Sequence, residues 1–205
     1  MCGSVQSSLN PSDLPPAGGS AFTTPTVSEA AADARASSYG GRLKSYRLLL
    51  GIAATVLLLD QLTKGWIVAN LPFPAYGEPH AIKVIDGVFH LVHVGNTGAA
   101  WSLFTGQSVF LAVLAAATLV GIFIWRRALG LRNRICQVAF GLLCGGVAGN
   151  LVDRLVHGHV IDFVDLHFGS YIYPTFNVAD SGICVGVVLY LWHSLRAPAP
   201  SGSSS

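Results

Sequence analysis

Charged side chains are scarce in this sequence. Only 11% of its 205 residues are Asp, Glu, Lys or Arg, whereas a soluble globular domain carries about a quarter. Apolar residues make up 52%, and the mean hydropathy is +0.55. This shortage of charge, together with long uncharged runs, excludes an ordinary soluble domain and predicts a membrane protein. A net charge of +2 is too small to indicate a nucleic-acid partner.

Cysteine is also rare, and its spacing excludes a cysteine-based zinc site. The sequence contains no C-x-x-C pair, and no histidine stands at zinc-site distance from a cysteine. Three of the four cysteines fall in apolar runs, where a cysteine usually behaves as a small hydrophobic residue. The four are Cys2, Cys136, Cys144 and Cys184.

Both ends of the chain lack apolar stretches. Residues 1–44 are rich in Ser, Pro, Ala, Gly and Thr, and such a segment buries too little surface to offset the entropy lost on ordering. We therefore predict a disordered cytoplasmic tail over 1–44, a membrane domain over 45–196 and a second disordered tail over 197–205. The first tail has no apolar h-region, so we expect no cleavable signal peptide.

Four apolar segments follow the N-terminal tail, and each is long enough, or nearly so, for a helix that crosses about 30 Å of hydrocarbon. The fold class predicted is therefore an all-α membrane protein with a four-helix bundle. Glycines repeat at i+4 in the third and fourth segments, which favours close helix packing. The segments are 48–71, 101–125, 135–152 and 176–195, and the glycines are Gly141, Gly145, Gly149, Gly182 and Gly186.

The distribution of Lys and Arg predicts the orientation. Four of these residues precede the first apolar segment, and four lie in the link at 126–134. Segments 72–98 and 153–175 contain only Lys83 and Arg154. The positive-inside rule places both termini and the 126–134 link in the cytoplasm and the other two connections outside.

The first outer connection has the pattern of a β-hairpin. Residues 82–85 and 88–94 are rich in β-branched residues and flank Asp86-Gly87, which is typical of a two-residue turn. We expect a small outward-facing sheet. The pattern leaves open whether this sheet holds an extended peptide by strand addition or only caps the bundle.

Polar residues of all four helices gather at one depth, just beneath the outer surface. Asp60 and Lys64 lie four residues apart on one helix face and can form an ion pair. We expect Asn96 to open the second helix, and Asn177 and Asp180 to lie in the first turns of the fourth. Ionisable groups at such depth usually have a function. At the outer end of the third helix we place Asn150, Asp153 and Arg154.

Two aspartates that share one proton provide a base to activate water and an acid to protonate a leaving amine. Asp60 has Lys64 nearby, and Asp153 has Arg154, so these two carboxylates suit orienting roles. Asp162 and Asp180 have no cation beside them in sequence, which favours them as the pair. The candidates considered are Asp60, Asp153, Asp162, Asp165 and Asp180.

Five blocks in these regions resemble the lipoprotein signal peptidase (signal peptidase II) family, in the order typical of that family. The resemblance covers about residues 48–195. The blocks are Asp60-Gln61-Leu62-Thr63-Lys64, Asn96-Thr97-Gly98-Ala99-Ala100-Trp101-Ser102, Gly145 to Arg154 (GGVAGNLVDR), Gly158-His159-Val160-Ile161-Asp162-Phe163 and Phe176-Asn177-Val178-Ala179-Asp180-Ser181.

The resemblance implies an aspartyl endopeptidase of the bacterial cytoplasmic (inner) membrane, with a catalytic dyad of Asp162 and Asp180 near the outer face. It implies prolipoprotein substrates cut just before a diacylglyceryl cysteine, contact with membrane lipid, inhibition by globomycin, and neither cofactor nor metal. Trp101 stands where the family usually has phenylalanine. The residues expected to bind substrate or orient the site are Asp60, Lys64, Asn96, Gly98, Asn150, Asp153, Arg154 and Asn177.

Other functions fit the residues less well. A proton- or ion-translocating bundle needs polar groups through the whole depth of the membrane, and the cytoplasmic half here has almost none. A zinc protease using His157, His159 and Asp162 would lack the His-Glu-x-x-His motif. A serine protease would lack G-x-S-x-G.

Overall fold

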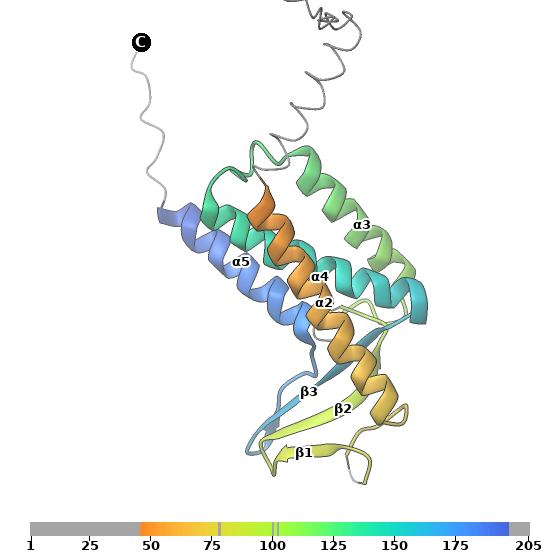
Figure 1. The fold of residues 1–205 in the computed structure, drawn as a ribbon. Coiled ribbons are helices and arrows are strands. Elements are labelled where there is room, and N and C mark those ends of the chain that lie inside the picture. Colours follow the sequence, from red (N-terminus) through yellow and green to blue (C-terminus); the bar gives the residue numbers. More distant parts are fainter. Residues whose placement is uncertain (1–45, 78, 100, 102, 197–205) are drawn as a thin grey trace, which may run out of the picture. The chain divides into compact units, whose positions relative to one another are not determined.

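A computed structural model describes residues 46–77, 79–99, 101 and 103–196. The tails predicted over 1–44 and 197–205 lie outside these residues. The described part is mostly helical, with a small sheet at one end of the helices (Figure 1). Its helices are α2 (Arg47–Asn70), α3 (Ser108–Ile124), α4 (Arg134–His157) and α5 (Val178–Arg196). Of these, α2, α4 and α5 are long and apolar enough to cross a membrane, and α3 is a shorter apolar helix.

The boundaries of α2 and α5 lie within two residues of those predicted, which is the ordinary uncertainty of a helix end. Helix α4 is longer than expected and runs five residues past 152. Asp153 lies within this extended part and forms a buried ion pair with Lys64. The helix ends at Gly158, whose φ of 75° is left-handed, a conformation that glycine adopts without strain.

Helix α3 begins at Ser108, not near residue 101 as predicted. Asn96 does not open this helix but ends a strand. Its side-chain Oδ1 accepts a hydrogen bond of 2.8 Å from the Gly98 N–H. Such a local bond offers the backbone an alternative to the helix. Trp101 and Phe104 then adopt φ values of 58° and 59°, which an α-helix does not contain.

The sheet is antiparallel, with the order β1-β2-β3-β4. The hairpin is confirmed, but three residues (86–88) rather than two connect its strands, because Ile85 pairs with Phe89. The third strand was not predicted and arises from the second outer connection. The strands are β1 (Ile82–Ile85), β2 (Phe89–Asn96), β3 (Val160–Phe168) and β4 (Tyr171–Ile172).

Glycines allow α4 to pack closely against both α2 and α5, as their spacing predicted. A Cβ atom on Gly145 would lie 2.7 Å from the main-chain oxygen of Ala53 in α2. One on Gly146 would meet the oxygen of Ala179 in α5, and one on Gly149 would meet the Asp60 carboxylate. Since the first two obstacles are backbone, a larger side chain there would have to push the helices apart.

A buried cation joins α2 to α4. Lys64 is 2% exposed, and its Nζ lies 2.8 Å from Asp60 Oδ2, 2.7 Å from Asp153 Oδ2 and 3.0 Å from Asn150 Oδ1. These three oxygens match the three N–H donors of an ammonium group. The predicted pairing of Asp60 with Lys64 is therefore confirmed. Asp153 is paired with Lys64 as well, instead of with the adjacent Arg154.

The same carboxylates reach the other elements. Asp60 Oδ1 accepts a hydrogen bond of 2.9 Å from the Ala179 N–H in the first turn of α5, where the helix dipole favours negative charge. Asp153 Oδ2 accepts one of 3.1 Å from the Ile161 N–H in β3. Gln61 donates to both carboxylates, at 3.2 and 3.0 Å. One cluster thus holds α2, α4, α5 and β3 together.

We expect Lys64→Met to destabilise the protein strongly. The substitution keeps an unbranched side chain but leaves the Asp60 and Asp153 carboxylates buried beside each other without a cation. Breaking a buried ion pair in this way costs about 3–5 kcal/mol. Thermal or denaturant unfolding of the purified protein in detergent measures the loss.

Lys83→Met is the matched control. Lys83 lies 3.2 Å from Asp86, and the two side chains are 43% and 83% exposed. Exposed pairs contribute at most about 1 kcal/mol, so this variant should unfold nearly like the wild type. Equal losses from the two substitutions would contradict a special role for the buried cluster.

Candidate active site

Asp162 lies on β3, opposite Val94 of β2, and is 1% exposed. Each of its oxygens accepts a hydrogen bond from an asparagine amide. Asn96 Nδ2 donates to Oδ2 at 3.0 Å, and Asn177 Nδ2 donates to Oδ1 at 2.7 Å. The carboxyl group is therefore fixed in orientation by neutral donors.

Asp180 is the third residue of α5 and is partly exposed. Its Oδ1 accepts a hydrogen bond of 2.7 Å from Asn150 Nδ2. Its Oδ2 accepts one of 3.3 Å from the Asn177 main-chain N–H, while Asn177 Oδ1 accepts one of 2.9 Å from the Asp180 N–H. This reciprocal pair has the form of a capping box. Asn177 is thus the residue that precedes α5, and it binds both aspartates.

Three asparagines present their NH₂ groups to the two aspartates because their oxygens already have donors. Asn150 Oδ1 is bound by Lys64 Nζ, Asn177 Oδ1 by the Asp180 N–H, and Asn96 Oδ1 by the Gly98 N–H. An amide whose oxygen accepts from a fixed donor can only turn its nitrogen to the other side. The network therefore determines which end of each amide faces a carboxylate.

Arg154 fixes the turn that carries Asn96. Its guanidinium donates to the main-chain oxygen of Asn150 at 3.2 Å and to that of Gly98 at 2.9 Å. This links the turn after β2 to the third helix of the bundle, α4. Arg154, the sequence neighbour available to pair with Asp153, donates its hydrogen bonds to the backbone instead, while Asp153 pairs with Lys64.

The surroundings of Asp162 favour its protonated form. Burial first, and the negative charge of Asp180 second, raise the pKa of Asp162 to about 7. The hydrogen bonds from Asn96 and Asn177 and the positive charge of Lys64 act in the opposite direction. A carboxyl group that titrates near neutral pH can exchange protons with water and with a leaving group.

The structure brings the predicted residues together, with one exception and one addition. Asp165, considered as a carboxylate candidate, lies three residues beyond Asp162 on β3 and so on the opposite face of the strand. Gln61 had no predicted role but bridges Asp60 and Asp153. The signal for it in the sequence is its place among the polar residues of the short stretch 60–64 in an otherwise apolar helix.

Comparisons with known proteins identify the family of the chain. The family described as Signal peptidase (SPase) II matches residues 52–196. The chain is 41% identical over 138 residues to the lipoprotein signal peptidase of Bacillus pumilus (strain SAFR-032), covering 67% of this chain and 86% of that protein. It is 44% identical over 152 residues to that of Burkholderia cenocepacia (strain HI2424), covering 72% and 87%.

Solved structures also match the fold. A bacterial membrane enzyme solved by the in meso method at 2.3 Å resolution is 29% identical, with a TM-score of 0.67, covering 77% of this chain and 93% of that one. A second, solved at 1.9 Å by the same method, is 30% identical with a TM-score of 0.61, covering 73% and 94%. The chain therefore belongs to the signal peptidase II family and is a bacterial membrane protease.

Proposed function

We propose that this protein removes the signal peptide from prolipoproteins and cuts just before a cysteine that carries diacylglycerol. The family and the name lipoprotein signal peptidase, shared by the relatives above, support the substrate class. The observation that carries the mechanism is that Asp162, which is buried, and Asp180, which is partly exposed, are joined through Asn177. Proton or ion translocation is not favoured. By the same resemblance, we propose that globomycin inhibits the enzyme and that the chain contacts membrane lipid.

In the proposed reaction the two aspartates share one proton. Asp180, the partly exposed member, is ionised and takes a proton from water as the water oxygen bonds to the scissile carbonyl carbon. Asp162, with its raised pKa, gives its proton to the leaving nitrogen as the C–N bond breaks. A later proton transfer between the two carboxyl groups restores the starting state. The asparagines hold both groups in place throughout.

We also propose α3 as a fourth membrane span, within a peptidase domain over 45–196. Its 17 residues span about 26 Å, a little less than the hydrocarbon core. It contains no charged residue and exposes large apolar side chains that need an apolar solvent. These include Val109, Phe110, Val113, Leu114, Val120, Phe123 and Ile124.

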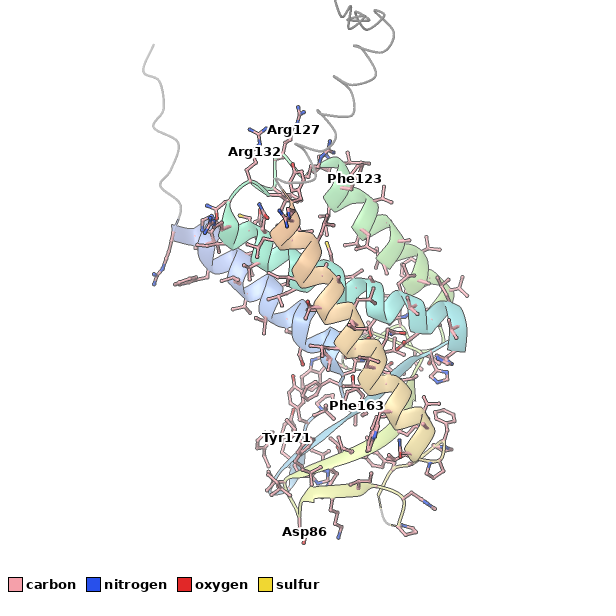
Figure 2. The ribbon with its side chains drawn as sticks, in the orientation of Figure 1. Asp86, Phe123, Arg127, Arg132, Phe163 and Tyr171 are labelled. Atoms are coloured by element: carbon pink, nitrogen blue, oxygen red, sulfur yellow. The ribbon has the colours of Figure 1, made fainter. Side chains whose placement is uncertain are left out.

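The proposed orientation places the sheet outside the cell. Arg127 and Arg132 lie at one end of the helices, and Asp86, in the turn between β1 and β2, lies beyond the other end (Figure 2). The positive-inside rule assigns the arginine end to the cytoplasm. The two aspartates, where the helices meet the sheet, would then lie near the outer surface.

We expect Asp162→Asn and Asp180→Asn each to abolish cleavage. Both changes keep the size of the side chain but remove the exchangeable proton. Loss of general acid–base catalysis lowers turnover by about 10²–10⁴-fold, and a cooperating pair tends to the upper end. The measurement is cleavage of a purified prolipoprotein, with and without its diacylglyceryl group, at matched enzyme concentrations.

The control for this experiment is Asp86→Asn, which makes the same change at an exposed position in the turn between β1 and β2 and should leave the rate nearly unchanged. Near wild-type cleavage by either dyad variant would refute the aspartyl mechanism. Equal cleavage of lipidated and unlipidated substrate would refute the substrate assignment.

The rate should fall as pH rises through about 7. Asp162 loses its proton there, and a doubly ionised pair has no acid for the leaving nitrogen. Asn96→Ala removes a hydrogen bond that stabilises the charged form, so it should raise this pKa and move the fall in kcat/KM to higher pH. Asn70→Ala, an exposed position on α2, should not move it. A shift to lower pH in Asn96→Ala would contradict the assignment.

The orientation is tested by labelling of introduced cysteines in a chain whose own four cysteines are replaced by serine. Asp86→Cys, in the exposed turn of the hairpin, should react with an impermeant thiol reagent added to intact cells. Ala128→Cys, exposed between α3 and α4, keeps every basic residue of its loop and should react only after permeabilisation. The opposite result would reverse the proposed orientation.

A further inference from the structure

Three side chains capable of binding a metal gather on one face of the sheet, away from the two aspartates. His90 of β2 lies directly opposite Asp165 of β3. His167 follows Asp165 by two residues, so its side chain lies on the same face. Each residue offers one ligand atom, a ring nitrogen of the histidines or a carboxylate oxygen of Asp165, and these three atoms lie within 4.8 Å of one another.

The carboxylate lies between the two imidazoles. Asp165 Oδ2 is 2.7 Å from His167 Nε2 and 3.7 Å from His90 Nδ1. The two imidazole rings meet edge to face, with centroids 4.6 Å apart. The hydrogen bond between His167 Nε2 and Asp165 Oδ2 accounts for the shorter distance. It does not account for the position of His90.

Two buried polar atoms of this cluster have no hydrogen-bond partner within the described part of the chain. They are Asp165 Oδ1 and His90 Nε2. The Asp165 side chain is only 4% exposed, so its second oxygen has little access to solvent. Buried polar atoms are nearly always satisfied, and a carboxylate that binds a cation can use both of its oxygens.

We propose that His90, Asp165 and His167 bind one divalent transition-metal ion, with Zn²⁺ as the best fit. Two imidazoles and one carboxylate are ligands that Zn²⁺ accepts in tetrahedral sites, with the fourth position open to water. Mg²⁺ and Ca²⁺ prefer oxygen ligands only. This site is independent of the proposed function. The sequence indicated no metal, because its histidines lack a zinc motif and only the β2–β3 register brings these three residues together.

The ion would act on the fold and not on the reacting atoms. Asp165 and Asp162 lie on opposite faces of β3, because they are three residues apart in one strand. A metal bound to His90 and Asp165 would fasten β2 to β3 at the end of the sheet remote from Asn96. It would therefore stabilise the pairing that also brings Asn96 to Asp162.

The test uses the full-length protein in detergent, with any affinity tag removed and bound metal extracted by a chelator. Titration with ZnCl₂, together with elemental analysis after desalting, should show one Zn²⁺ per chain. His90→Gln and His167→Gln should each weaken binding by at least about tenfold, since even indirect partners of a metal contribute that much. Zn²⁺ should raise the melting temperature of the wild type, but not of these variants.

His80→Gln, the same change at an exposed position of the first outer connection, is the matched control and should bind like the wild type. His157→Gln and His159→Gln test a second pair of histidines elsewhere in the structure, whose rings are 6.1 Å apart. Binding that is lost in this second pair of variants and kept in His90→Gln and His167→Gln would overturn the proposal.

A measurement of metal binding by the wild-type protein tests the proposal even if the histidine variants fail to fold. Co²⁺ in a tetrahedral site with nitrogen and oxygen ligands absorbs visible light far more strongly than hexahydrated Co²⁺. Stoichiometric growth of these bands, reversed by Zn²⁺, is the expected result. Absence of both the bands and stoichiometric Zn²⁺ binding in the wild type would also overturn the proposal.

Discussion

The buried ammonium group of Lys64 is the contact on which the arrangement of the polar residues depends. Its donors reach carboxylates on two helices and the oxygen of Asn150. Those carboxylates in turn accept main-chain N–H bonds from the start of α5 and from β3. Burial of this cluster is tolerable only because every partner is present. Helix α5 and strand β3, which carry the two proposed catalytic groups, are therefore joined to α2 and α4 by electrostatics as well as by apolar packing.

The position of this cation also matters for chemistry. A lysine in direct contact with Asp162 or Asp180 would favour the ionised form of each and remove the acid that amide hydrolysis requires. Here Asp60 and Asp153 lie against the ammonium group, and Asn150 stands between Lys64 and Asp180. Asn150 therefore fixes the orientation of the Asp180 carboxylate, and its amide group separates that carboxylate from the positive charge of Lys64. Neutral amides thus hold the proposed dyad, and burial first and the charge of Asp180 second still raise the pKa of Asp162, against the opposing charge of Lys64.

The sequence sufficed for features that depend on local periodicity. Helices α2 and α5, the hairpin and the Asp60–Lys64 pair follow from spacing alone. It did not suffice for β3, because residues 160–168 alternate poorly and form a strand only by pairing with the distant β2. It also gave Asp153 the wrong partner, since adjacency suggested Arg154 whereas helix packing supplied Lys64. The late start of α3 depends on the Asn96–Gly98 bond, a choice between local conformations that hydrophobic patterning does not reveal.

Strand β3 carries different chemistry on its two faces, with Asp162 on one and Asp165 on the other. The side-chain period of a strand is two, so a shift of one residue in its pairing exchanges the faces completely. An insertion or deletion of a single residue between Gly158 and Asp162 would therefore present an apolar side chain, Ile161 or Phe163, to Asn96 and Asn177. The length of this short connection is constrained as tightly as the identity of the aspartate. Lineages of this protein should vary there by substitution and keep the number of residues constant.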